Sequence, residues 1–111
     1  MAKLTRPPAE TPPLYAQDGA GYEATVFAHY FVGGCDWWIT EYDPSEDRAF
    51  GFVNLGDPQN AELGYIDLAE LESVRAPVNV NGTRINNALP VEFDRYWSRV
   101  TLAEATKAVR G

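Results

Sequence analysis

The chain has one cysteine, one histidine and no long apolar run. A single cysteine, Cys35, cannot form an intramolecular disulfide, and with one histidine it leaves no zinc pattern of several Cys and His residues. The apolar stretches are far shorter than the roughly 20 residues that cross a bilayer as a helix. Pro7 and Pro8 stand where a signal peptide would have its apolar region. These absences predict a cytoplasmic protein with no membrane contact, no metal and no cofactor.

Apolar residues are nevertheless plentiful, at 45% of the chain, and 13% of residues are aromatic. A chain of 111 residues suits one domain, and a domain of this size buries roughly 65% of the surface of its unfolded chain. Four prolines fall within residues 7–13, where they disfavour regular structure. We therefore expect a poorly ordered lead-in over residues 1–13 and a single globular domain over residues 14–111.

Negative charge dominates, with 16 acidic against 9 basic side chains and a net charge of −7. Residues 36–72 hold ten of the acidic groups and only one basic group, Arg48. Nucleic acids and anionic membranes would repel this segment over roughly 8 Å at physiological salt. The charge predicts no direct nucleic-acid binding and favours a basic protein as partner.

Four strands are predicted in succession from β-branched and aromatic runs bounded by turn residues. A short connection at Gly33 and Gly34 indicates that the first two pair as a hairpin. Gly51, inside the third, is typical of a bulge or of a close backbone approach. The four segments are residues 25–32, 36–42, 49–54 and 62–66.

Two short helices follow from capping patterns in which a capping residue precedes a glutamate by three positions. Asp67 with Glu70 opens the first helix, and Thr101 with Glu104 opens a second that extends to Val109. Residues 79–87 are rich in Asn and Gly and predict a loop with a tight turn at Asn81–Gly82. Residues 91–100 are expected to be extended. The fold class is α+β: an antiparallel meander of about four to five strands with two short helices.

Three segments resemble the bacterial family called domain of unknown function 2958. They are Pro12–Gly19 (PPLYAQDG), Trp38–Asp43 (WITEYD), and Glu62–Tyr65 (ELGY) with Leu71–Arg75 (LESVR). The resemblance covers roughly residues 12–97 and implies a short protein of the kind often encoded on plasmids, phages and integrated elements. Asp67 stands where the family usually has Ser or Thr, which preserves the capping chemistry. The resemblance implies a fold and a genetic context, and it assigns no catalytic residue.

Catalytic hypotheses find little support in the sequence. His29 lies in a predicted strand without a Ser or Cys at a familiar spacing, so a sheet residue is the simpler interpretation. Cys35 neighbours Asp36, whose charge opposes thiolate formation. Asp43, Ser45 and Asp47 alternate like calcium ligands, but Arg48 and Asn54 occupy the positions where an EF-hand loop has Gly and Glu.

Candidate binding residues come from the acidic block and from two adjacent tryptophans. Trp37 and Trp38 must point to opposite faces of a strand, which favours a two-layer core over an exposed interface. Carboxylates in the loops of residues 43–48 and 56–62 could imitate the phosphate backbone of a nucleic acid and bind in a basic groove of a partner protein. The candidate partner-binding residues are Asp43, Glu46, Asp47, Asp57, Glu62, Trp37 and Trp38.

The sequence favours a non-enzymatic binding protein that inhibits or modulates a host nucleic-acid-handling or defence complex, of the anti-CRISPR or anti-restriction type. No phosphate loop, metal set or nucleophile motif is present, which argues against catalysis. Two alternatives stay open: a small enzyme with a site around His29, and a homo-oligomeric accessory protein.

Overall fold

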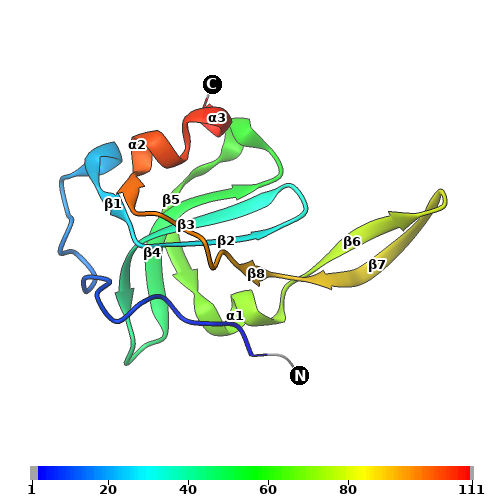
Figure 1. Cartoon of the computed structure of the whole chain (residues 1–111), viewed down its shortest axis with the longest axis horizontal. Helices are drawn as coiled ribbons and strands as arrows, with labels where there is room; N and C mark the ends of the chain where they lie inside the picture. The colour runs from blue at the N-terminus through cyan, green and yellow to red at the C-terminus, as the bar shows by residue number, and fades with distance from the viewer. Residues whose placement is uncertain (1–2, 111) are drawn as a thin grey trace.

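A computed structural model describes residues 3–110, which fold around one five-stranded antiparallel sheet (Figure 1). Its strand order is β5–β4–β3–β2–β8, so four strands that follow one another in the chain are also neighbours in space. The predicted meander and the α+β class are confirmed. The strands are β2 (Ala28–Val32), β3 (Cys35–Asp43), β4 (Arg48–Leu55), β5 (Glu62–Asp67) and β8 (Glu92–Phe93).

The first predicted strand is divided between two sheets. Strand β1 (Thr25–Val26) pairs with β9 (Val100–Thr101), whereas β2 pairs with β3. Phe27 separates β1 from β2, and its backbone N–H still donates to the carbonyl of Ile39 at 2.8 Å. Two short 3₁₀ helices are also present: η1 (Gly21–Glu23) precedes β1, and η2 (Pro58–Asn60) connects β4 to β5.

Both predicted helix starts are confirmed. The carboxylate of Asp67 accepts hydrogen bonds from the backbone N–H groups of Ala69 and Glu70 and so caps α1 (Leu68–Ser73). Thr101 accepts from the Glu104 N–H and caps α2 (Leu102–Ala105). The second helix is not continuous to Val109, because the chain departs from helical geometry at Thr106 before α3 (Lys107–Arg110).

Apolar side chains form a core on each face of the sheet, so the predicted two-layer core is correct. Trp37 lies on one face with Tyr30 and Ile39, which the side chains of α1 cover. Trp38 lies on the other face with Phe52, where Leu102 of α2 packs. Alternation along β3 explains this division, because adjacent strand residues point to opposite faces.

The N-terminal segment makes specific contacts with the sheet and α1. Leu4 is buried, and its backbone N–H donates to Glu72 at 2.7 Å. Arg6 forms ion pairs with Asp47 at 2.7 Å and with Glu72 at 2.8 Å. Leu4 and Arg6 of the expected lead-in therefore contact the folded domain, whereas residues 1, 2 and 111 lie outside the described range.

The prediction of a loop over residues 79–87 is wrong. Strands β6 (Arg75–Val80) and β7 (Thr83–Pro90) form a separate antiparallel hairpin, here called the arm (residues 75–90), which projects from the body (Figure 1). Only the turn was predicted correctly, since Asn81 and Gly82 have φ of 51° and 82°, as a two-residue hairpin turn requires. The Asn residues suggested a loop, but Asn79 pairs with Arg84 in the strand ladder.

Residues 91–100 are extended only at their two ends, so that prediction is correct only in part. Between β8 and β9 the chain turns, with the Asp94 carboxylate accepting from the Tyr96 N–H at 3.1 Å. This turn brings Trp97 back onto the sheet, where its indole N–H donates to the Val26 carbonyl at 2.9 Å.

Within residues 3–110, none of the helices has the length and apolar character needed to traverse a membrane.

Candidate functional site

The predicted acidic residues lie at opposite ends of the sheet. Asp43 and Glu46 belong to the turn between β3 and β4, whereas Asp57 and Glu62 lie where η2 leads into β5. Eight residues of β4 separate the two groups, a distance of about 24 Å at the rise of a β-strand. The structure therefore does not gather them into one patch.

Asp47 differs from the other acidic candidates because it is part of the folded framework. It pairs with Arg6 and accepts a 2.5 Å hydrogen bond from the Tyr42 hydroxyl. The hydrogen bonds from Arg6 and Tyr42 hold the pKa of Asp47 below its usual range despite partial burial. Burial and the bond to Asp47 raise the pKa of Tyr42 to about 12. Asp47 therefore holds the N-terminal segment against the folded domain through its ion pair with Arg6.

Trp37 and Trp38 are both core residues, with exposed fractions of 6% and 5%. Neither offers a surface for a partner in this conformation. Their hydrophobic area stabilises the two layers, as aromatic side chains do in ordinary cores.

His29 is held between two carboxylates. Its Nε2 lies 2.8 Å from Asp36 and its Nδ1 lies 3.0 Å from Asp94, and its ring stacks on Trp38 at an interplanar angle of 10°. The side chain of His29 is only 14% exposed. Burial disfavours the charged ring, but the hydrogen bonds and charges of Asp36 and Asp94 outweigh it and raise the pKa of His29.

This arrangement suits a structural imidazolium better than a general base. A general base needs a free ring nitrogen near its substrate, and both nitrogens of His29 already have carboxylate partners. The hairpin register contained the signal for Asp36: His29 pairs with Trp38, which places Asp36 diagonally beside the ring. Asp94 could not be found this way, because it comes from the turn after β8.

Burial and the charge of Asp36 also raise the pKa of Cys35, which opposes a nucleophilic role.

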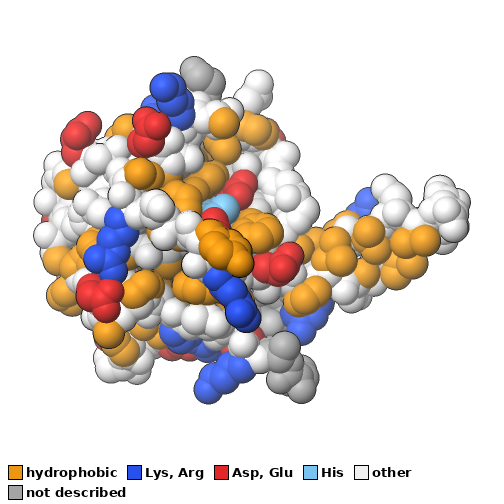
Figure 2. All heavy atoms as spheres, in the orientation of Figure 1, with side chains coloured by type: hydrophobic (Ala, Val, Ile, Leu, Met, Phe, Trp, Pro, Cys, Tyr) orange, Lys and Arg blue, Asp and Glu red, His pale blue; other side chains and the backbone are white. Residues whose placement is uncertain are grey.

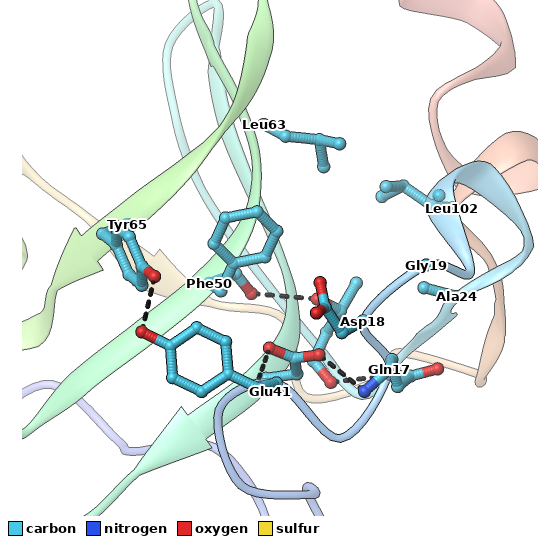
Figure 3. A pocket seen from close by; sticks show the side chains of 12 residues that line it. Gln17, Asp18, Gly19, Ala24, Glu41, Phe50, Leu63, Tyr65 and Leu102 are labelled. Carbon is cyan, nitrogen blue, oxygen red and sulfur yellow. Dashed lines mark hydrogen bonds between the residues drawn. The ribbon is translucent and has the colours of Figure 1, made fainter.

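A pocket of about 330 Å³ lies beside β4 and β5 and was not predicted from the sequence (Figure 3). Four separate parts of the chain form it: the loop of residues 15–24, the middle of β3, the facing residues of β4 and β5, and Leu102 of α2. Apolar walls come from Phe50, Leu63 and Leu102. Its size is at the lower end of the range of small-ligand pockets.

A bulge in β3 turns Glu41 toward this pocket. The register with β4 shifts between Ile39 and Glu41, so Thr40 is an extra residue. The extra residue changes the alternation, and the 5%-exposed Glu41 comes to lie on the same face as Trp38. Its two carboxylate oxygens accept from the backbone N–H groups of Tyr15 at 2.8 Å and of Gln17 at 2.7 Å.

The loop that covers the pocket is fixed by one amide and one aromatic side chain. The Gln17 side chain donates to the carbonyls of Thr25 and Thr40 and accepts from the Thr25 N–H, all within 2.9 Å. Tyr15 adopts a left-handed φ of 74°, rare for a bulky residue. Its hydroxyl lies 2.9 Å from the Tyr65 hydroxyl, across the pocket mouth. The loop is therefore preorganised.

A model of one protein family matches residues 22–104, and the family is described as a protein of unknown function, DUF2958. The chain belongs to the DUF2958 family. The suspected resemblance is confirmed, although the matched range begins later than residue 12 and extends beyond residue 97. No match was found among curated proteins, and none was found among solved structures.

The segments that carry the DUF2958 resemblance meet around the pocket. Tyr15, Gln17 and Asp18 come from PPLYAQDG, Glu41 comes from WITEYD, and Tyr65 comes from ELGY. Sequence reasoning treated these segments only as strands and turns, because nothing in their spacing indicates that they converge. The pocket is a property of the tertiary fold, because it forms only where these distant segments meet.

Proposed function

We propose that this protein is a non-enzymatic binding protein that inhibits or modulates a host nucleic-acid-handling or defence complex, of the anti-CRISPR or anti-restriction type. The observation that carries the proposal is the negative charge at each of the two ends of the edge strand β5. Asp57 and Glu62 lie at the start of this edge strand, and Asp67 lies at its end. Arg48 of β4 pairs with Asp67 on one side and with Asp43 of β3 on the other. The pocket lies between these two acidic ends.

A basic groove on a partner would be complementary to this surface. Strand β5 is six residues long and spans about 17 Å, so one groove could reach both acidic ends. Asp43 accepts hydrogen bonds from Ser45, which hold the pKa of Asp43 below its usual value and keep its carboxylate charged. Exposed charges of this kind mainly accelerate association and select the partner. The contacts of His29 favour binding over the alternative of a small enzyme.

The first test removes charge from one end of β5. After affinity capture from bacterial lysate and purification of a captured protein, we expect Asp57→Asn/Glu62→Gln to slow association about tenfold at low salt. At high salt the variant and the parent should converge, because counterions screen the lost attraction. Association rates at two salt concentrations measure this.

The matched control is Glu92→Gln/Glu104→Gln, which removes the same charge from exposed positions outside β5. It should leave the association rate within about twofold of the parent. If both double variants slow association equally, only net charge matters and the β5 surface is not the binding site. Asp47 is left intact because its pair with Arg6 fastens the N-terminal segment.

A second candidate function, a homo-oligomeric accessory protein, is favoured by the arm. Cross-strand partners share a face, and one face of the arm is apolar, with Val78 opposite Ile85 and Ala76 opposite Leu89. Val80, Ile85 and Leu89 are 47%, 44% and 37% exposed, and Figure 2 shows the apolar side chains along the arm. An isolated two-stranded hairpin is only marginally stable in water. Burial of this apolar face against another protein surface would stabilise the arm.

Charge favours a second copy of the chain as that partner. Residues 75–90 carry Arg75 and Arg84 and no acidic residue, whereas the body is strongly acidic. We expect light scattering to find a dimer that Ile85→Asp converts to monomer, because a charge would enter the apolar contact. Asn79→Asp, on the polar face, is the control and should remain dimeric. A parent chain that is monomeric at high concentration would exclude self-association through the arm.

A further inference from the structure

We propose that the pocket between residues 15–24 and strands β3, β4 and β5 binds a guanidinium group. This inference rests on the proposed function in one point only, which is that an arginine of the partner protein supplies the guanidinium group. A free guanidinium compound presents the same chemistry, and the experiment below separates the two.

Uncompensated negative charge is the first argument. Two carboxylates, Asp18 and Glu41, line the pocket, and no lysine, arginine or histidine does. Neither carboxylate takes part in an ion pair with the other described residues 3–110. A cation in this pocket would meet two negative charges and no positive charge among the described residues that line it.

Glu41 is held ready to accept hydrogen bonds from a ligand. Each of its oxygens accepts one backbone N–H, whereas an ionised carboxylate offers about four acceptor positions. Two positions are therefore left for a donor from the pocket. Because the backbone of residues 15–17 fixes the carboxylate, a ligand would not have to order it, and the entropic cost of binding falls.

Aromatic walls distinguish guanidinium from other cations. The rings of Phe50 and Tyr65 lie 5.3 Å apart and nearly perpendicular, at 71°. A flat guanidinium can stack on one ring while its N–H groups reach the carboxylates, whereas an ammonium group is compact and strongly hydrated. The chain itself makes such a contact on Tyr65, where the Arg48 guanidinium carbon lies 5.6 Å from the ring centroid.

A bare metal ion fits this pocket less well. Hard cations such as Ca²⁺ prefer six to eight oxygen ligands, and the two carboxylates here stand among apolar walls of Phe50, Leu63 and Leu102. Within residues 3–110, no three His, Cys, Asp or Glu side chains are grouped so that they could hold a metal. The combination of apolar surface and two carboxylates matches a cation that is organic, planar and rich in N–H donors.

The test compares two probes of the same shape by NMR titration of the full chain. N-acetyl-arginine amide carries the guanidinium, and N-acetyl-citrulline amide replaces it with a neutral urea. We expect the arginine probe to shift the amide signals of Tyr15, Gln17 and Leu63 and to bind at least about tenfold more tightly than the citrulline probe. Equal binding of the two probes, or shifts elsewhere in the chain, would overturn the assignment.

Two variants and one control locate the site. Asp18→Asn should weaken the arginine probe about tenfold, and Leu63→Trp should fill the pocket and abolish binding. Glu92→Gln removes the same charge from an exposed position that does not line the pocket, and it should change affinity less than about twofold. An equal loss in Asp18→Asn and Glu92→Gln would mean that only net charge attracts the probe, and the pocket would be rejected.

The source of the guanidinium is settled with the purified partner. If Leu63→Trp releases the partner as well as the probe, the ligand is a partner arginine. If it releases only the probe, a free guanidinium compound is the ligand. Probe binding without any partner removes the proposed function and leaves the pocket assigned, whereas partner binding without probe discrimination refutes the pocket alone.

Discussion

Gly51→Ala is expected to lower the free energy of unfolding by about 3 kcal/mol or more. A Cβ at position 51 would lie 1.8 Å from the carbonyl oxygen of Trp38 and 2.8 Å from its carbonyl carbon. Both are backbone atoms of a central strand, so no side-chain rotation can relieve the clash. The bulge at Thr40 and the close approach at Gly51 lie side by side in paired strands.

Gly64→Ala is the matched control for this prediction. Gly64 pairs with Gly51 across β4 and β5, and a Cβ there would meet no atom within 4 Å. The same substitution should therefore leave stability within about 0.5 kcal/mol of the parent. Urea unfolding measured by tryptophan fluorescence compares the two. Similar midpoints for both variants would show that β3 and β4 do not approach this closely.

Gly51 also connects stability to the pocket. The strand pairing it permits keeps the β3 bulge in register, and the bulge aims Glu41 at the pocket. A Gly51→Ala protein that still folds should lose the arginine-probe affinity predicted above. Gly64→Ala, on the edge strand, should keep it. The local packing of one glycine thus supports a site built from segments that are distant in the sequence.

The elements that the sequence predicted correctly are those with strong local signals. β2 to β5 combine β-branched and aromatic runs with clear turns, and Asp67 and Thr101 carry their own capping partners three residues away. Gly51 was correctly associated with a close approach, because a glycine inside a strand has few other uses. Such signals depend only on neighbours in the chain.

The failures lie where distant contacts or composition decide. Residues 79–87 of the arm were predicted as a loop because the asparagines conceal the alternation of Val78 and Val80, although Asn81–Gly82 between two such runs is a strong hairpin signal. Charge counting selected Asp47 together with Asp57 and Glu62, and it could not show that Asp47 pairs with Arg6, which lies 41 residues away. The pocket needs the loop of residues 15–24 to fold over β3, which no local pattern encodes.

His29→Gln is expected to destabilise the protein by about 2 kcal/mol in mildly acidic solution and by less in alkaline solution. The folded protein holds the imidazolium between Asp36 and Asp94, and its side chain is only 14% exposed. These contacts raise the pKa of His29 above 6.5, the ordinary value that the unfolded chain keeps. The stabilisation is complete below that value and is lost as pH rises through the pKa of the folded protein.

Urea unfolding of parent and variant between about pH 5.5 and about pH 9 tests this sign. The stability difference between them should be constant at the acidic end and shrink as pH rises, and NMR titration of the ring should place its pKa above that of a model histidine. Asp94→Asn is the control: it keeps the ring and removes one charge, so the titration should move toward lower pH. A difference that grows with pH would mean that His29 is held neutral, which would restore it as a candidate general base.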